Sequence, residues 1–481
     1  MLSIITFACF SSATFAQPAT SWTQTFGGSS VDLGKSVQQT TDGGFIIAGE
    51  TVSYGAGGYD VYLVKTDASG NEQWSQTFGG NLNDYGYSVQ QTSDGGYIIA
   101  GGTISYGAGM YDIYLIKTDA SGNERWSQPF GGSDFEQGYS VQQTSDGGYI
   151  VVGGSASFGA GSDDVYLIKT DASGNQQWSQ TFGGSFSDWG HSVQQTSDGG
   201  YIIAGITWSY GAGNWDVYLI KTDALGTEQW SQVFGGGEYD YGYYVQQVGY
   251  NGYIIAGSSS SNGTAGGQDV YLIKTDAAGI EQWSQTFGGN DSDEGMSVQQ
   301  TNDGGYIIAG SSSSNGTAGN QDVYLIKTNV AGIEQWSQTF GGNDSDEGMS
   351  VQQTSDGGYI IAGRTESFGS GSSDIWLIRL DSETGMIELD LQQPLTYSLF
   401  PAYPNPCNPS TLIRFEMPMA GDVQIQVYDL QGNLVTVLAD NWLTPGTYQV
   451  PFRGDNLPSG IYFARLTAGD FTTTQKLVLM K

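Results

Sequence analysis

The sequence predicts an all-β protein, a seven-bladed β-propeller followed by a small immunoglobulin-like β-sandwich. Two observations carry this prediction. A unit of 52–53 residues recurs seven times between Trp22 and Asp381, and a tail of different composition follows the last copy. No segment of the unit has the spacing of apolar residues that an amphipathic helix needs, so every element is expected to be a strand.

The repeated unit opens with the motif W-[ST]-Q-x-F-G-G in every copy. Seven tryptophans mark the copies: Trp22, Trp74, Trp126, Trp178, Trp230, Trp283 and Trp336. A fixed period slightly above 50 residues is typical of propeller blades. A linear β-solenoid is the alternative architecture for such a repeat.

Each unit contains four strand-like pieces, which read WSQTF, SVQQT, YIIAG and DIYLIKT in the second copy. The first two pieces are half-polar, whereas the last two are almost entirely apolar or β-branched, as buried strands are. The turns SDGG and DASGN have the residues of tight hairpins. Four antiparallel strands in every unit favour a propeller blade.

The ends of the repeats favour a closed ring. The first copy begins with a lone strand of the outer type, Trp22–Phe26, and no further copy of it follows the last apolar strand at Ile375–Asp381. We therefore expect these two strands to pair, which removes both free sheet edges. The strand-like segment Met386–Leu391 competes for the same edge.

Paired glutamines recur in the SVQQT strand, which is the innermost strand in this arrangement. Because successive side chains of a strand alternate between its two faces, we expect one glutamine of each pair to face a wet central channel. The other is expected to bond within or between blades. The pairs are Gln38/Gln39, Gln90/Gln91, Gln142/Gln143, Gln194/Gln195, Gln246/Gln247, Gln299/Gln300 and Gln352/Gln353.

The net charge of −34 belongs almost entirely to the repeats, because residues 394–481 contain five basic and six acidic residues. An acidic surface repels phosphate backbones, so nucleic acid is not an expected partner. Cations, basic peptides and neutral sugars are compatible with such a surface.

Signatures of catalysis are scarce in the chain. His191 is the only histidine, which excludes a metal cluster built on histidines. Neither a nucleophile elbow nor a phosphate-binding loop occurs. We expect no enzymatic activity and no cofactor or metal. The alternative is an extracellular hydrolase or lyase that acts on polysaccharides through carboxylates of the variable face.

One face of the repeats is expected to be the interaction surface. The SDGG and DASGN hairpins barely vary among the copies, whereas the loops after F-G-G and after YIIAG differ, and variable exposed loops often hold binding residues. Aromatic side chains beside glycines and carboxylates suit stacking on sugar rings, and they suit rigid turn packing equally well. We therefore expect a carbohydrate or protein ligand. The candidate ligand-binding residues are Tyr54, Tyr106, Phe158, Trp208, Tyr210, Trp215, Phe368, Asp293 and Asp346.

The motif NDSDEG, at residues 290–295 and 343–348, has the look of a cation-binding loop. One of its acids recurs in all seven copies. This acid is Asp32, Asp84, Glu136, Asp188, Asp240, Asp293 or Asp346. A single acid in such a loop is usually a turn residue that accepts nearby backbone N–H groups. The spacing of an EF-hand is not met, because the sixth position from Asp291 is Met296 instead of glycine. We interpret the motif as a turn with at most weak affinity for Ca²⁺.

Residues 1–16 resemble a signal peptide, with a short apolar run followed by small residues up to Ala16. No later apolar run reaches the length that spans a membrane. Cys9 lies in this segment, so Cys407 is the only cysteine expected in the mature chain. We therefore expect no intramolecular disulfide.

The composition changes at residues 392–418, where prolines cluster and the repeat stops. Short strand-like segments without a helix follow, which predicts an immunoglobulin-like sandwich. The expected organisation is a propeller at 22–381, a linker at 382–396 and a tail domain at 397–481.

Several motifs of a known family occur together in this tail. They are Tyr403–Pro406, Asn408–Pro409, Val427–Asp429, Leu457–Tyr462 and Lys476–Lys481. On these residues the tail resembles the type A C-terminal sorting domain of the bacterial type IX secretion system. The resemblance implies transport across the outer membrane by the type IX machinery, often with removal of the tail. It also implies a secreted or cell-surface location.

Overall fold

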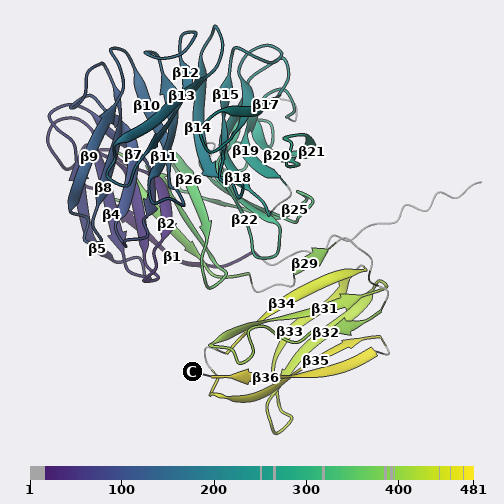
Figure 1. Ribbon diagram of the computed structural model, residues 1–481. Helices are drawn as coiled ribbons and strands as arrows, with labels where there is room; N and C mark the ends of the chain where they lie inside the picture. The colour runs from purple at the N-terminus through teal and green to yellow at the C-terminus, as the bar shows by residue number, and fades with distance from the viewer. Residues whose placement is uncertain are drawn as a thin grey trace, which may run out of the picture.

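The computed structural model describes residues 17–480 except 250–251, 264–266, 317–319, 384–386, 391–393, 395, 444, 455–456 and 470. The predicted signal peptide lies outside the described residues. Within them the chain forms 36 strands in nine four-stranded sheets and no helix, which confirms the all-β prediction. Seven of the sheets come from the repeats, and we call them the repeat array (residues 20–380); the other two form the tail (Figure 1).

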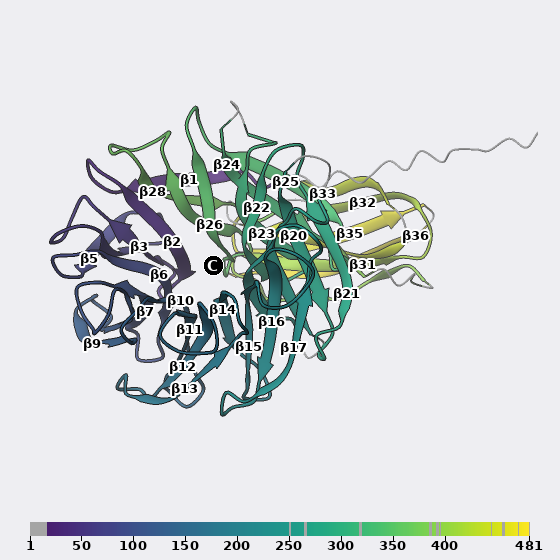
Figure 2. The same cartoon turned by 90° about the horizontal axis from the view of Figure 1, so that it is seen from above.

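Six sheets of the array each consist of four consecutive antiparallel strands. The first three sheets are β2 (Asp32–Gln39), β3 (Phe45–Thr51), β4 (Asp60–Thr66) and β5 (Glu72–Phe78); β6 (Asp84–Gln91), β7 (Tyr97–Thr103), β8 (Asp112–Thr118) and β9 (Glu124–Phe130); and β10 (Glu136–Gln143), β11 (Tyr149–Ser155), β12 (Asp164–Thr170) and β13 (Gln176–Phe182). The next three sheets are β14 (Asp188–Gln195), β15 (Tyr201–Thr207), β16 (Asp216–Thr222) and β17 (Glu228–Phe234); β18 (Asp240–Gln247), β19 (Tyr253–Ser259), β20 (Asp269–Thr275) and β21 (Glu281–Phe287); and β22 (Asp293–Gln300), β23 (Tyr306–Ser312), β24 (Asp322–Thr328) and β25 (Glu334–Phe340). Figure 2 shows the first strands of the sheets around a common centre.

The seventh sheet joins the two ends of the repeats. It contains β26 (Asp346–Gln353), β27 (Tyr359–Thr365) and β28 (Asp374–Leu380), and β1 (Thr20–Phe26) forms its outer edge. β1 runs antiparallel to β28, with Phe26 opposite Ile375. The predicted pairing of the first strand with the last apolar strand is therefore confirmed. The competing segment instead forms β29 (Ile387–Asp390), which pairs with a strand of the tail although it lies in the predicted linker.

The innermost strands are tied to one another by glutamine side chains. The Gln38 carboxamide oxygen accepts the backbone N–H of Gln91 on the next sheet at 2.6 Å. The same bond joins the last sheet to the first, from the N–H of Gln39 to Gln352, also at 2.6 Å. The second glutamine of a pair bonds across as well, since Gln91 accepts the N–H of Thr41 at 2.9 Å. Both glutamines thus hold neighbouring sheets together, and this goes beyond the single bonding glutamine that the sequence predicted.

The hydrophobic core of the array lies between adjacent sheets. One cluster combines Ile46 and Leu63 of the first sheet with Ile99 and Ile116 of the second. An equivalent cluster joins the seventh sheet to the first. The two middle strands of each sheet are therefore covered on both faces, which explains why they read as nearly continuous apolar runs.

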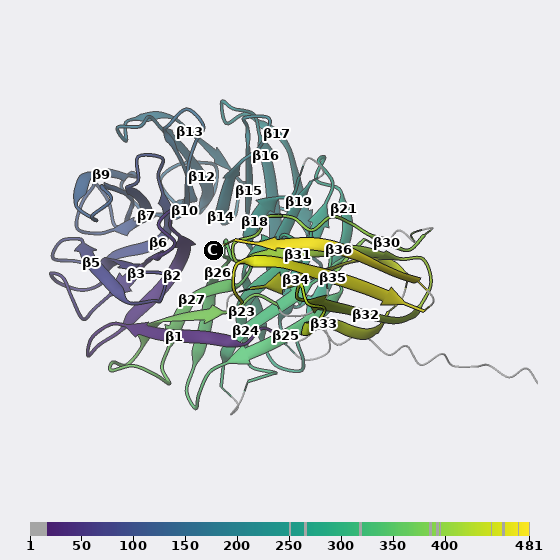
Figure 3. The same ribbon diagram turned by 90° about the horizontal axis from the view of Figure 1, so that it is seen from below.

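The array has two ends, which we name by their connections. The hairpin end holds the turns at 40–44 and 67–71 and their counterparts, where the N–H of Thr40 bonds to the carbonyl of Gly44 at 2.9 Å. The loop end holds the segments at 27–31 and 52–59 and their counterparts. The tail lies at the hairpin end (Figure 3), where the Arg453 guanidinium donates to the carbonyl of Asp356 at 3.2 Å.

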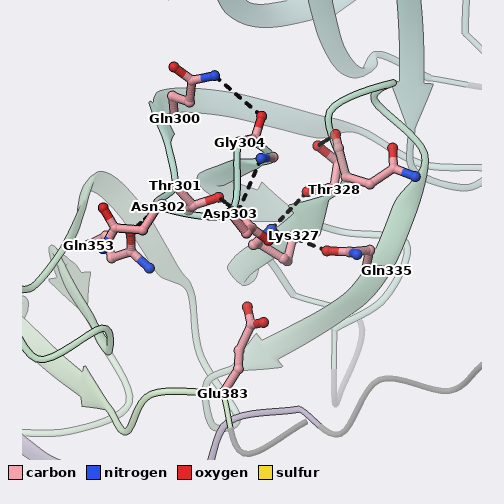
Figure 4. A network of polar contacts seen from close by, with 12 residues as sticks. Gln300, Thr301, Asn302, Asp303, Gly304, Lys327, Thr328, Gln335, Gln353 and Glu383 are labelled. Atoms are coloured by element: carbon pink, nitrogen blue, oxygen red, sulfur yellow. Dashed lines mark hydrogen bonds and ion pairs between the residues drawn. The ribbon is translucent and has the colours of Figure 1, made fainter. Parts of the chain in front are cut away.

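A lysine–aspartate pair recurs at the hairpin end, and its setting differs in the sixth sheet. Lys117 and Asp94 are 3.0 Å apart, and the Asp94 side chain is 64% exposed. Lys327 and Asp303 are 2.7 Å apart, but their side chains are only 1% and 4% exposed. Glu383, which follows β28, lies beside this pair (Figure 4).

Glu383 covers this part of the sixth and seventh sheets. Its carboxylate accepts the indole N–H of Trp336 at 3.2 Å and the hydroxyl of Tyr359 at 2.7 Å. Burial raises the pKa of Glu383. The segment that leaves the array is therefore packed against it.

The tail consists of two four-stranded sheets around one core. One sheet contains β29, β30 (Ser398–Leu399), β31 (Ser410–Met417) and β34 (Gly446–Arg453), and the other contains β32 (Gly421–Tyr428), β33 (Leu434–Leu443), β35 (Gly460–Ala468) and β36 (Phe471–Leu479). Phe415, Ile425, Phe452 and Leu466 are all fully buried between the sheets. Cys407 is also buried there as a free thiol. The immunoglobulin-like assignment stays a prediction.

Candidate functional site

Five of the predicted aromatic residues make the same contact in different repeats. The Tyr54 hydroxyl donates to the carbonyl of Gly27 at 2.8 Å, and its ring packs against Tyr62 with the ring centres 5.5 Å apart. Tyr106 and Tyr210 repeat both contacts, and Phe158 and Phe368 repeat the ring contact. The rings stay partly exposed at the loop end. These contacts are the ones expected if the aromatic side chains pack the turns rigidly, which was the alternative to stacking on sugar rings.

Trp208 and Trp215, the other two predicted aromatics, belong to an exposed cluster. Their ring centres are 5.7 Å apart, and Phe186 lies 5.8 Å from Trp208. Phe186 is not among the residues predicted from the sequence to bind a ligand. These three rings occur together only in the fourth repeat among the described residues, so they break the symmetry of the loop end.

Asp293 and Asp346, the predicted acidic candidates, are 0% exposed. The Asp293 carboxylate accepts the N–H of Gly289 at 2.9 Å and the hydroxyl of Ser314 at 2.7 Å. Asp346 makes the equivalent bonds to Gly342 and Ser367. Their burial leaves no carboxylate surface for a ligand, and the bonds are those of a turn residue. This corrects their selection as ligand-binding residues.

The buried acids meet a second acid across a glycine. A carbon atom placed on Gly79 would lie 2.1 Å from Oδ1 of Asp60 and 2.6 Å from Oδ2 of Asp84. Burial raises the pKa of Asp60, and the nearby Asp84 raises it further. Two carboxylates so close disfavour double ionisation. The first glycine of W-S-Q-T-F-G-G, which is Gly79 in the second copy, therefore has to lack a side chain.

A continuous arc of aromatic rings lies on the innermost strands at the loop end. We call it the aromatic arc, and it consists of Tyr85, Tyr87, Tyr139, Trp189, His191, Tyr241 and Tyr243. Successive ring centres across neighbouring sheets are 5.3 Å apart from Tyr87 to Tyr139, 5.3 Å from Tyr139 to His191 and 5.5 Å from His191 to Tyr243. The arc spans four consecutive sheets, those that begin with β6, β10, β14 and β18.

Hydrogen bonds fix several rings of the aromatic arc. Gln137 donates to the Tyr87 hydroxyl and accepts from the Tyr139 hydroxyl at 3.0 Å. Nδ1 of His191 lies 3.0 Å from the carbonyl of Gly242. A carbonyl can only accept, so this nitrogen carries the proton. Burial lowers the pKa of His191 and favours the neutral ring.

The innermost strands of the other three sheets carry charged or apolar side chains at these positions, including Lys35, Glu294 and Glu347. We call these three residues, together with Glu50 on β3 and Arg364 on β27, the charged arc. Arg364 pairs with Glu347, and it lies 3.0 Å from Glu366. Burial raises the pKa of Glu294, and the adjacent Glu347 raises it further. The aromatic arc and the charged arc therefore lie at the same end of the array, on different sheets.

Sequence reasoning missed both arcs, although a signal was present. The residues on either side of the glycine in the inner strand read LGK, YGY, QGY, WGH, YGY, EGM and EGM in the seven copies. These positions vary inside a strand whose other residues are almost constant. The residues predicted to bind a ligand lie in or beside the variable loops and do not include these strand positions.

Comparison with known families identifies the tail. Residues 401–480 match the family described as secretion system C-terminal sorting domain. The chain is thus a repeat protein of β-sheets with a type IX sorting domain at its C-terminal side. This domain indicates a secreted or outer cell-surface location. In the part of the chain that the structure describes, no helix is long and apolar enough to cross a membrane.

One curated protein is similar to part of the chain. The regulatory protein FlaEY of Caulobacter vibrioides is 27% identical over 233 residues, which are 41% of this chain and 24% of that protein. The chain thus spans about a quarter of the length of this curated relative.

Two solved structures align with most of the chain at low similarity. A fungal alcohol oxidase of the AA5 family in complex with copper has a TM-score of 0.43 at 11% identity, over 96% of this chain and 100% of that one. The aldose sugar dehydrogenase of Streptomyces coelicolor has a TM-score of 0.34 at 9% identity, over 76% and 100%. Scores this low carry no argument about function.

Proposed function

We propose that the protein is an exported binding protein whose seven sheets form a seven-bladed β-propeller with a carbohydrate site at the loop end. The propeller is supported by the glutamine bonds that run from each innermost strand to the next, including the last to the first. The sorting domain supplies the route of export.

The aromatic arc is the observation that best supports a carbohydrate site. Among seven nearly equal repeats, only four sheets carry these aromatic rings on their innermost strands, and the charged arc lies on the other three. A sugar has an apolar ring face and hydroxyl edges, so it can pack on rings such as Trp189 and bond to tyrosine hydroxyls and carboxylates. A protein ligand is the alternative partner.

A glycan array probed with the purified protein tests this proposal. Trp189→Ala should abolish binding of the saccharides that the wild-type protein retains. Trp178→Ala deletes the same side chain from the outer strand β13, where it packs on Tyr201, and should leave binding intact. Equal loss in both variants, or no saccharide retained by the wild-type protein, would overturn the assignment.

One observation favours a second candidate, an enzyme that cleaves polysaccharides. Glycosidases use one protonated and one ionised carboxyl group. The raised pKa of Glu294 suits the acid, and the second carboxyl group would be that of Glu347, which pairs with Arg364. Release of reducing ends from a bound polysaccharide, lost in Glu294→Gln while binding persists, would favour catalysis over binding alone.

The export role of the tail has its own test. A chain that ends before residue 397, expressed in the native host, should fold and remain in the periplasm. Normal delivery of this shortened chain to the surface or medium would contradict a sorting role.

A further inference from the structure

The axial channel has a polar wall made by the innermost strands. Its volume is about 180 Å³, and serine, valine and glutamine side chains line it, with Tyr244 as the only aromatic residue among the described lining groups. No lining residue of the described chain carries a charge. The channel is distinct from the two arcs at the loop end.

The glutamines of this wall are held in one orientation. Each of the seven lining glutamines accepts, through Oε1, the backbone N–H of the next sheet at 2.5–2.7 Å. The amide nitrogen Nε2, which has two N–H donors and no acceptor capacity, is then left on the channel side. These Nε2 atoms have no hydrogen bond to another described residue.

The lining serines likewise accept hydrogen bonds from a neighbouring sheet and keep a donor for the channel. The Ser36 hydroxyl oxygen accepts the N–H of Val89 at 3.3 Å, and the other four lining serines accept a valine N–H in the same way. Their O–H hydrogens remain to donate. The bonds between sheets thus use the acceptors of the wall and leave its donors to the channel.

We propose that this channel binds a small monovalent anion, of halide or carboxylate chemistry, through converging amide N–H and hydroxyl donors. Amide donors fixed by other bonds need no reorganisation when an anion enters. The carboxylates of this acidic protein lie elsewhere, and at physiological ionic strength their repulsion is screened over about 8 Å. Binding should therefore weaken at low ionic strength.

Bromide locates the site, because it is a halide that anomalous diffraction identifies. Crystals of the full protein grown or soaked in sodium bromide should show an anomalous peak on the axis, within hydrogen-bond reach of the glutamine amides. Sodium acetate should displace the peak if carboxylates share the site, and leave it if only halides bind. A channel without bromide would overturn the proposal.

A matched pair of variants tests the donors in solution. Gln90→Glu with Gln194→Glu keeps the Oε1 acceptors of the sheet bonds and removes two channel amides. Gln91→Glu with Gln195→Glu adds the same charge on the same strands, but their Nε2 groups donate to the carbonyls of Gly95 and Gly199, outside the channel lining.

Chloride affinity, measured by ³⁵Cl NMR line broadening, should fall at least about tenfold in the first variant and little in the second. Equal losses in both variants would mean a general charge effect and overturn the proposal. If the first variant does not fold, the bromide peak in the wild-type protein decides.

Discussion

At the two ends of the fourth sheet, the pKa of a carboxyl group is shifted in opposite directions. At the hairpin end, hydrogen bonds from Thr196 and Lys221 outweigh burial and lower the pKa of Asp198 to about 2. At the loop end, burial beside Asp240 raises the pKa of Asp216 to about 6. The hairpin end pairs its acids with lysines, whereas the loop end packs acid against acid. The same sheet is thus stabilised at one end and stores unfavourable charge at the other.

The two ends also differ in what they contact and in how much their sequence varies. The hairpin end repeats the same lysine–aspartate contact in most sheets and supports the tail. The loop end varies on the innermost strands and carries both arcs. Strained electrostatics and sequence variation therefore coincide at the end proposed to bind a ligand, as they do at many functional sites.

Both ends depend on the sheets between them, and the largest effect should come from removing the strand that joins the N-terminal side of the repeats to the seventh sheet. Deleting residues 17–27 removes β1, the buried Phe26 and the edge of the seventh sheet. We expect the free energy of unfolding to fall by more than about 5 kcal/mol. Chemical denaturation measures this loss. An unchanged transition would show that the array does not need closure.

Within the hairpin end, the covered pair should matter more than the exposed pairs. Asp303→Ala leaves Lys327 buried without its partner and should cost about 3–5 kcal/mol. Asp94→Ala removes the same contact where Asp94 is mostly exposed and should cost less than about 1 kcal/mol. Both variants are compared by urea denaturation. Equal costs would mean that the segment around Glu383 does not seal the sixth sheet in solution.

The opposite pKa shifts predict a pH dependence that belongs to the loop end. The folded-state pKa of Asp216 lies above its unfolded value, so its contribution to stability is full below the unfolded pKa and is lost as the pH rises through about 6. Asp216→Asn should therefore reduce the loss of stability between pH 5 and 7.5 by about 1–1.5 kcal/mol.

Asp198→Asn is the control for this prediction. Its lowered folded-state pKa contributes stability above the unfolded pKa that is lost only as the pH falls toward about 2. This variant should leave the slope between pH 5 and 7.5 unchanged. A slope that is the same in all three proteins would remove the proposed contrast between the ends.

The smallest effect is expected from the exposed acids of NDSDEG. Asp291 and Asp344 are exposed, and each donates its backbone N–H to a serine hydroxyl. Asp291→Asn with Asp344→Asn should change stability by less than about 0.5 kcal/mol. Calorimetry should detect only weak, salt-sensitive Ca²⁺ binding. Tight binding that disappears in the variant would identify a metal site in place of a turn.

The sequence by itself determined the elements and their order. Turn residues, strand periodicity and a fixed spacing are local or repeated signals, so the four strands of each unit and the pairing of Trp22–Phe26 with β28 could be predicted. The motifs of the tail likewise identified its family without a structure.

Tertiary structure alone decided which side chains meet. The acids Asp60 and Asp84 belong to different repeats and become neighbours only when the sheets pack. Asp293 was predicted to bind a ligand because it follows a variable loop, but its side chain is buried. The aromatic arc joins residues about one repeat apart in sequence, and the channel donors arise because bonds between sheets use the glutamine acceptors. Such contacts depend on the angle and closeness of neighbouring sheets, which no single unit of the sequence specifies.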